Sequence, residues 1–510
     1  MHSLIALLPL GVFLLFSLGM SVYARRHAQR AGKGFVSEYF LGSRTLGGFM
    51  LAMTTVATYG SVSSFVGGPG QAWLVGYGWA YMAVVQVTSL IMLYGIVGKK
   101  MALISRRLGA VTVVDVIRKR YGSDALANLS ALIMVVFFSA TMVAQFVGGA
   151  KLFEAVTGYS YTTGLVLFGV AVILFATVGG FRGVTLVDAV CGIVMLLGVA
   201  VLAGGVLHAG GGYESIMASI AERRPEMLEP FSGGTMPAGL YFTQWLLVGT
   251  LTFVLPQQAV RTMGSRNTKS FRRAIVMGTV IVGAMMVGVT SIGVLSAGVL
   301  TGSLADYGAS VDNIIPTAIA QTLPPLLAGV AIIGPIAASI STVASLLVVS
   351  SSAVMSDVYL HYCERAGRLP GFRTVSFGSR FVTFGIGVVV FVLAVVPPDV
   401  IWKINMFAFG GLETAFLGVL VGGLFWKRAN RTGALLSMAG GTVAYCTAMA
   451  CGFTIGGLHQ IVIGVAVSAV LLVVGSLATR HAPSAQLEAF FPEDALGEEA
   501  ETARGAIRER

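Results

Sequence analysis

The chain has 510 residues, of which 56% are hydrophobic and only 11% are charged, and its mean hydropathy is +0.85. A soluble domain of this length carries about 25% charged residues, so the composition excludes a soluble globular protein and indicates an integral membrane protein. The apolar runs are long rather than short and alternating, which predicts an all-α membrane protein and excludes a β-barrel.

The net charge of +11 does not indicate a nucleic-acid-binding protein, because the sequence shows no basic groove with interleaved aromatic residues. The 33 Lys and Arg residues lie in short clusters between alternate apolar runs. If about 13 runs cross the membrane, all but four of the Lys and Arg residues fall on one side of it. The exceptions are Lys151, Arg223, Arg224 and Lys403. The positive-inside rule then places the N-terminus outside the cell and the C-terminus in the cytoplasm.

The residues of common enzyme sites are missing from the sequence. Four cysteines occur without a CxxC spacing, and six histidines occur without HExxH. No pairing of a nucleophile with a base stands out either. The sequence therefore predicts that the chain is not an enzyme.

The first apolar run, 4–23, is followed rather than preceded by Arg25 and Arg26, so we expect a retained helix and not a secretory signal. The further predicted spans are 46–74, 78–98, 125–155, 162–179, 184–208, 239–257, 274–300, 326–349, 380–396, 400–425, 433–451 and 457–478. We expect a transmembrane domain over 1–480 and an acidic, disordered cytoplasmic tail over 481–510.

The second span contains a break that a simple membrane helix would not tolerate. The stretch 57–70 reads ATYGSVSSFVGGPG, with Gly60 in mid-span and Pro69 lacking an N–H. Freed backbone carbonyls at membrane depth cost several kcal/mol unless something binds them. Carbonyls and hydroxyls without a nearby charge are ligands for a small hard cation such as sodium, and a broken helix marks the central site of many transporters. The alternative is a Gly/Ser surface for helix packing.

The chain also carries a sign of internal symmetry. Five spans after the break at Gly60, the seventh span is interrupted by Gly249 and Pro256. Matching interruptions in two five-helix halves predict a 5+5 inverted repeat, with core repeats at about 46–208 and 239–425.

The ninth span supplies hydroxyl groups. Its stretch 337–345 reads AASISTVAS, and Ser341 and Ser345 share a helix face with Thr342 beside it. Two carbonyls from the second span, the carbonyl of Ala338 and two hydroxyls here would suffice for sodium. Ordinary Ser/Thr packing against a neighbouring helix is the alternative.

Several other polar residues lie within predicted spans. Asp188 starts the sixth span, either as a functional carboxylate or as a helix cap, and Arg182 is a candidate partner. Glu413 is intramembrane, and we favour a structural hydrogen-bonding role for it. Side chains that could contact either a polar solute or a neighbouring backbone are Gln86, Gln145, Gln244 and Trp245.

The runs at 38–44 (EYFLGSR), 47–48, 52–54, 57–59 and 63–70 closely resemble the sodium:solute symporter family, and 38–70 resembles its pantothenate branch. The resemblance covers about residues 5–480 and includes 179–182, 408–413 and 428–430. It implies thirteen spans, a LeuT-like inverted-repeat core and sodium-driven symport by alternating access. It also implies a bacterial cytoplasmic membrane, with pantothenate or a similar small carboxylate as the partner and no obligatory protein partner.

Carried over by position, the resemblance implies a sodium site and a solute site. Sodium would be bound by the backbone oxygens of Ala57, Gly60 and Ala338 and by the hydroxyls of Ser341 and Thr342. The solute would lie between the two broken spans, and the candidate contacts, with Trp245 as a gate, are Tyr59, Ser63, Ser64, Gln86, Gln145 and Trp245.

Two departures weaken the match to a second sodium site at Asp188 and Ser345. Ala344 lacks a hydroxyl that relatives supply, and Cys191 stands where relatives often have Gln. Two alternatives to pantothenate import stay open. One is sodium symport of another small carboxylate or of an amino acid such as proline. The other is a transporter-like sensor, which the short tail after Pro483 disfavours because it leaves no room for an output domain.

Overall fold

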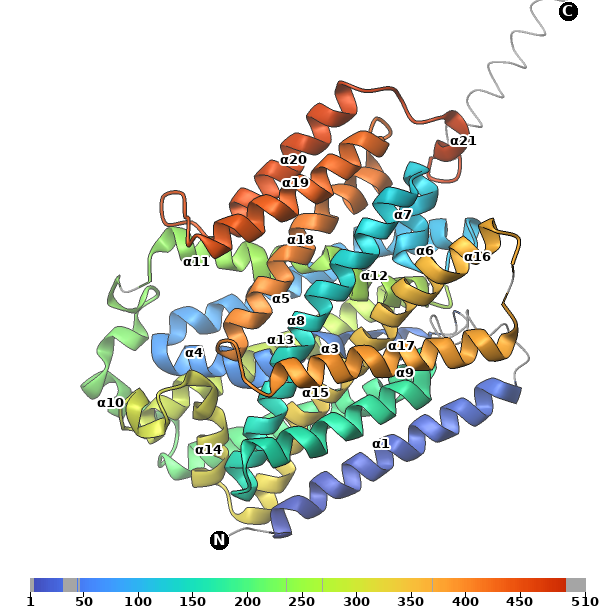
Figure 1. The fold of residues 1–510 in the computed structure, drawn as a ribbon. Coiled ribbons are helices and arrows are strands. Elements are labelled where there is room, and N and C mark those ends of the chain that lie inside the picture. Colours follow the sequence, from blue (N-terminus) through green and yellow to red (C-terminus); the bar gives the residue numbers. More distant parts are fainter. Residues whose placement is uncertain are drawn as a thin grey trace, which may run out of the picture.

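The computed structural model describes residues 4–30, 44, 46–234, 236–267, 269–368 and 370–491 (Figure 1). Within these ranges all regular structure is helical, apart from one isolated bridge between Leu46 and Ser265. The expectation of an all-α protein is therefore confirmed. The motif residues 38–43 and the tail after Phe491 lie outside the described residues.

The first half of the chain forms the following helices, with two π-helical segments at Ser63–Gly67 and Leu93–Val97: α1 (Leu4–Arg30), α3 (Gly48–Tyr59), α4 (Gly68–Val75), α5 (Tyr77–Met92), α6 (Gly98–Arg107), α7 (Val113–Tyr121), α8 (Asp124–Thr157) and α9 (Tyr161–Ala209). Side chains cap several of them: Thr112, Ser123 and Ser160 accept hydrogen bonds from the first turns of α7, α8 and α9.

The second half forms α10 (Tyr213–Arg223), α11 (Ala238–Trp245), α12 (Pro256–Met263), α13 (Lys269–Val299), α14 (Ile314–Thr322), α15 (Pro325–Ser352), α16 (His361–Arg365), α17 (Phe372–Ala394), α18 (Ile401–Phe425), α19 (Arg431–Ala450), α20 (Ile461–Leu477) and α21 (Ser484–Leu487). Between α11 and α12 the chain is π-helical over Leu246–Thr250 and 3₁₀-helical over Leu251–Val254.

The helix α15 lies at the centre of the bundle. It packs against α8, α9 and α1, and it is buried along almost all of its length. Around it α1 lies along one edge of the bundle, while α19 and α20 pair with each other and with α18 at the opposite edge (Figure 1). The two broken segments, α3–α4 and α11–α12, lie inside the bundle and contact both α15 and α18.

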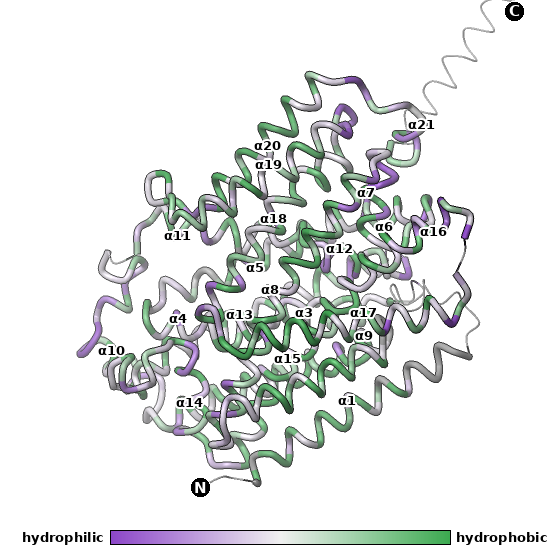
Figure 2. Tube along the Cα trace, viewed as in Figure 1, coloured by the Kyte–Doolittle hydropathy of each residue, from purple (hydrophilic) through white to green (hydrophobic). Residues whose placement is uncertain are grey.

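Hydropathy follows this architecture. Long apolar stretches occupy the middle of the helices, and polar residues gather near α10 and α14 at one end and near α7 and α16 at the other (Figure 2). By length and composition, nine helical segments of the described residues can cross a membrane, or ten if the bent pair α3–α4 is one span. The helix α9 supplies two of them, Tyr161–Gly179 and Gly183–Ala209. The count of thirteen stays a prediction.

Close backbone packing should make the contact between α4 and α13 sensitive to a single methyl group. A Cβ added at Gly293 would lie 2.2 Å from the carbonyl oxygen of Pro69. We expect Gly293→Ala to lower stability by about 1–3 kcal/mol or more, because overpacking against backbone finds no flexible neighbour to yield. Thermal unfolding of the purified protein in detergent measures this, with Gly95→Ala as the control because open space surrounds Gly95. Equal melting temperatures for the two variants would contradict the packing described.

Candidate functional site

The site begins where α3 ends. Gly60 has φ −67° and ψ 114°, so helical geometry stops there, and α3 and the helix that resumes at Ser63 are bent by 59°. Nearby side chains bind the backbone groups that this break releases. The Ser64 hydroxyl donates to the carbonyl oxygen of Tyr59 at 3.0 Å, and the N–H of Val62 donates to Oε1 of Gln145 at 2.8 Å.

Two other carbonyls of the break, those of Ala57 and Gly60, face the hydroxyls of α15. The Ser341 Oγ lies 3.4 Å from the carbonyl oxygen of Ala57, and the Thr342 Oγ1 lies 3.3 Å from that of Gly60. These are long for hydroxyl hydrogen bonds. Oxygens about 2.4 Å from a shared cation, at right angles, lie roughly 3.4 Å apart, so the separation within each of these two pairs is one that a shared cation would allow. Ala338, one turn earlier on α15, is also buried.

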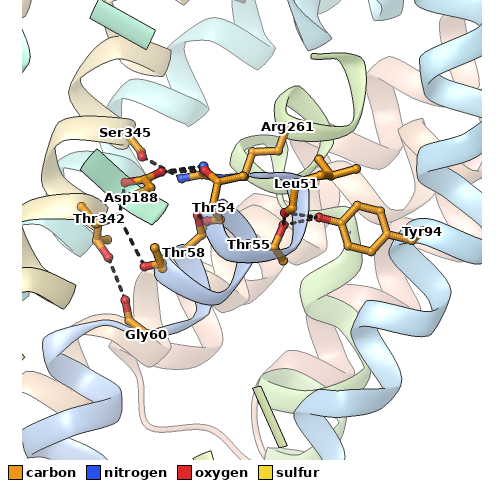
Figure 3. A network of polar contacts seen from close by, with 12 residues as sticks. Leu51, Thr54, Thr55, Thr58, Gly60, Tyr94, Asp188, Arg261, Thr342 and Ser345 are labelled. Carbon is orange, nitrogen blue, oxygen red and sulfur yellow. Dashed lines mark hydrogen bonds and ion pairs between the residues drawn. The ribbon is translucent and has the colours of Figure 1, made fainter. Parts of the chain in front are cut away.

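A buried ion pair adjoins these hydroxyls (Figure 3). Asp188 on α9 accepts hydrogen bonds from the hydroxyl of Thr54 at 2.7 Å, from that of Ser341 at 2.5 Å and from Nη1 of Arg261 at 2.8 Å. Nη2 of Arg261 donates to the Ser345 hydroxyl at 2.8 Å. The guanidinium of Arg261 thus connects the two residues of the candidate second sodium site.

Asp188 lies inside α9, and no helix starts at it, so the interpretation of this residue as a helix cap is wrong. The partner suggested from sequence, Arg182, has a side chain that lies outside the described residues. Arg261 was not singled out in the sequence, because it is 73 positions from Asp188 and follows the second break on α12. The sequence feature that could have pointed to Arg261 is its position as a basic residue shortly after Pro256.

A central cavity lies beside the break. Water-sized molecules can enter only about 50 Å³ of it, so the cavity is narrow in this conformation. Its lining residues, none of them charged, are Thr58, Tyr59, Ser61, Ser63, Ser64, Gly68, Trp79, Ala83, Gln86, Thr252, Leu255, Gln257, Gln258, Met286, Thr290, Trp402, Asn405, Met406 and Phe409.

Four of the six candidate solute contacts line this cavity, namely Tyr59, Ser63, Ser64 and Gln86. The other two lie elsewhere. Gln145 binds the broken backbone of the second span through Val62. Trp245 packs against Tyr241 with ring centroids 4.6 Å apart and does not line the cavity.

The cavity contains polar side chains that the sequence did not single out. Gln257 and Gln258 follow Pro256 in the first turn of α12, and Asn405 belongs to α18. A side-chain oxygen of each of these three residues is buried without a hydrogen-bond partner among the described residues. Unsatisfied buried amides at a cavity wall are groups that a polar ligand would satisfy.

Two tryptophans separate this cavity from a larger outer one. Trp79 and Trp402 line both cavities, and their rings meet edge to face with centroids 4.9 Å apart. The outer cavity has about 1180 Å³ that water-sized molecules can enter, and it carries an Asp399–Lys403 ion pair. Burial lowers the pKa of His459 in this cavity to about 4, so its imidazole is neutral at pH 7. The tryptophan pair therefore lies between the two cavities.

Residues 39–441 match the sequence model of the sodium:solute symporter family. The chain belongs to that family. It is 37% identical to the sodium/pantothenate symporter of Haemophilus influenzae and 38% identical to that of Escherichia coli, and each match covers 94% of this chain and 98% of the relative. The osmoregulated proline transporter OpuE of Bacillus subtilis is 26% identical over 96% of this chain and 98% of its own length.

Solved structures show the fold of this symporter. A substrate-bound, outward-open sodium-coupled sialic acid symporter superposes with a TM-score of 0.79 at 18% identity, covering 95% of this chain and 99% of that one. Mhp1, a nucleobase-cation-symport-1 family transporter, superposes with a TM-score of 0.60 at 13% identity, covering 88% of this chain and 97% of its own. The LeuT-like fold implied by the resemblance is thereby confirmed.

The Asp188–Arg261 pair of this symporter should behave as one unit. Removing one partner leaves a buried, uncompensated charge, so we expect Asp188→Asn and Arg261→Gln each to destabilise the protein by about 3–5 kcal/mol. The double variant should recover much of that loss. Thermal unfolding of the three variants measures this coupling.

The matched control is the exposed Asp399–Lys403 pair, where Lys403→Gln should change stability by less than about 1 kcal/mol. Additive losses in the Asp188/Arg261 double variant would show that the two charges do not compensate each other.

Proposed function

We propose that this chain is a sodium-coupled importer of pantothenate. The observation that carries the proposal is an uncharged cavity, rich in hydroxyl and amide groups, beside a helix break whose carbonyls are separated from the facing hydroxyls by distances that a shared cation would allow. The two relatives at 37–38% identity, matched over nearly their whole length, are sodium/pantothenate symporters.

The chemistry of the cavity fits this solute. Pantothenate is a monoanion with two hydroxyls, an amide and a gem-dimethyl group. We assign its hydroxyls and amide to Ser63, Gln86 and the amides of Gln257, Gln258 and Asn405. Trp79, Trp402 and Phe409 offer the apolar surface that the gem-dimethyl group requires.

The carboxylate needs a positive field, and no cationic side chain lines the cavity. Two sources remain. The N-terminus of α12 adjoins the wall at Leu255 and Gln257. Pro256 has no N–H and the N–H of Gln258 donates to the carbonyl of Leu255, so the helix dipole and the N–H of Gln257 are what this end can offer. The sodium ion, held at Ala57 and Gly60, would lie next to the cavity residues Thr58, Tyr59 and Ser61. Solute and ion would thus stabilise each other across a short distance.

We assign the sodium to Ala57, Gly60, Ala338, Ser341 and Thr342, and we infer that one ion is bound. Asp188 and Ser345 would make a second site, but the guanidinium of Arg261 already supplies a positive charge to both. One sodium with one monoanion is electroneutral. The sodium gradient then supplies about 1.4 kcal/mol for each tenfold concentration ratio.

We further propose a bacterial cytoplasmic membrane location with the N-terminus outside. The distribution of basic residues supports this, and at the opposite end Lys151 is paired with a carboxylate, Asp312, at 3.1 Å. Labelling of single cysteines introduced at Glu222 and at Lys427 with an impermeant reagent tests it. We expect the first to react from outside intact cells and the second only after permeabilisation.

The sodium site gives a sharp prediction. Ser341→Ala and Thr342→Ala should each raise the half-saturating sodium concentration by about tenfold or more, because a ligand to a charged species contributes about 1.5–3 kcal/mol. Sodium activation of labelled pantothenate uptake measures this. Ser351→Ala is the matched control, since its hydroxyl donates to Val348 on the same helix, away from the break. Unchanged sodium activation in both site variants would refute the assignment.

The solute and the stoichiometry are tested together in proteoliposomes. We expect a tenfold inward sodium gradient to drive about tenfold pantothenate accumulation without measurable current, and unlabelled pantothenate to compete far better than proline or acetate. If proline blocked the uptake better than pantothenate does, the proposed solute would be wrong. A current that accompanies pantothenate uptake would require a second sodium ion, worth about 2.3 kcal/mol per 100 mV.

A further inference from the structure

Glu413 lies at the middle of α18, deep within the membrane-spanning part of the molecule. Its side chain is fully buried, with an exposed fraction of 0%. Neither carboxyl oxygen has a hydrogen-bond partner among the described residues. An acidic residue in the middle of a span is a functional candidate by default, with its partner to be named, and here the structure provides no partner.

The helical register connects Glu413 to the central cavity. Asn405, Phe409 and Glu413 follow one another at intervals of four residues on α18, so they share a face. Asn405 and Phe409 line the cavity, whereas Glu413 does not. The carboxyl therefore lies one turn beyond the cavity floor, on the path toward the cytoplasmic end of α18.

The titratable groups around Glu413 are two phenols. Tyr59 from α3 and Tyr445 from α19 are close enough to interact electrostatically with it. Both phenol protons are directed elsewhere: Tyr59 donates to Ser89 at 2.6 Å, and Tyr445 donates to the carbonyl oxygens of Met406 and Phe407 at 3.3 Å. Neither phenol therefore stabilises a charge on Glu413.

The other elements packed against α18 bring no charge to Glu413. The segments Ser63–Gly67 and Leu246–Val254 and the helix α20 contain no charged residue. The charged residues of α8 lie at its two ends, in Asp124, Lys151 and Glu154. Those of α7 meet the cytoplasmic end of α18, where Arg120 donates to the carbonyl oxygen of Gly423.

The free energy of a charge decides the state of this group. An ionised carboxylate in an apolar interior without a cation or donors costs many kcal/mol, and such a group takes up a proton instead. In the closed cavity of this structure Glu413 is therefore the neutral acid. Opening of the cavity toward the cytoplasm would bring water to the same face of α18 and allow the carboxyl to ionise.

We propose that Glu413 is an exchangeable proton-binding site of the transport cycle. The carboxylate takes one proton from water while its face of α18 is hydrated, and only the resulting neutral acid allows the cavity to close again. The inference requires alternating access, but neither the identity of the solute nor the sodium ligands enters it. It predicts that ionised Glu413 slows the return to the closed conformation, so turnover falls at alkaline pH.

Infrared spectroscopy of the purified protein in sodium-free choline buffer tests the protonation state directly. We expect the carbonyl band of a protonated carboxylic acid at neutral pH, shifted in D₂O, and a loss of intensity in Glu413→Gln. Glu222→Gln is the control, because the side chain of Glu222 is exposed on α10. Glu413→Met serves the same comparison if the Gln variant does not fold.

The proposal would be overturned if the carbonyl band of the protonated carboxylic acid were identical in the wild type and in both Glu413 variants. Conversion of the band into a carboxylate band on adding sodium would overturn it too, because that would make Glu413 a sodium ligand instead.

Uptake provides the second test. The maximal uptake rate of the wild type should fall at least tenfold between pH 7 and the alkaline limit of its stability, and the rate of Glu413→Gln should stay constant over the same range. The Gln side chain imitates the neutral acid in size and has no proton to lose. A flat wild-type profile, or the same alkaline fall in Glu413→Gln, would contradict proton exchange at this residue. An inactive but folded Gln variant would contradict it too.

Discussion

The organisation of this protein depends on backbone carbonyls that are released in the middle of a membrane-spanning helix. In hydrocarbon each such group must be bound by something. Here specific side chains meet the released groups. Ser64 binds the carbonyl of Tyr59 and Gln145 binds the N–H of Val62. The hydroxyls of Ser341 and Thr342 face the carbonyls of Ala57 and Gly60. The spacing of those last two pairs suits a cation better than it suits hydrogen bonds.

Charge near the site is balanced by fixed groups. Asp188 is a carboxylate close to the proposed sodium ligands, since Ser341 contacts both it and the carbonyl of Ala57. Arg261 neutralises that carboxylate from the second broken segment, so the ion pair links α9 to α12 (Figure 3). The cavity itself holds no charged side chain, which leaves the ion, the helix dipole and the solute to balance one another.

Much of the fold and part of the site follow from local sequence. Apolar runs predicted the helices, Gly60 and Pro256 predicted the two breaks, and the hydroxyls of Ser341 and Thr342 predicted the face of α15 that meets the first break. Local pattern is sufficient there because hydrophobicity, glycine and proline act within one helix.

Contacts between distant helices could not be predicted in this way. Gln145 was expected to contact the solute, but it binds the N–H of Val62, 83 positions earlier. Trp245 was considered as a gate, whereas Trp79 and Trp402 separate the two cavities. Arg261, Gln257 and Asn405 were missed, because the rotation and crossing of packed helices decide which side chains reach a cavity, and a single sequence contains no record of that rotation.

Solute accumulation in sealed membrane vesicles, with sodium replaced by potassium or choline and no proton gradient present, is the most direct test of the cation site at the helix break. The account predicts accumulation with an inward sodium gradient and only equilibration with potassium or choline. Equal accumulation with all three cations would contradict it.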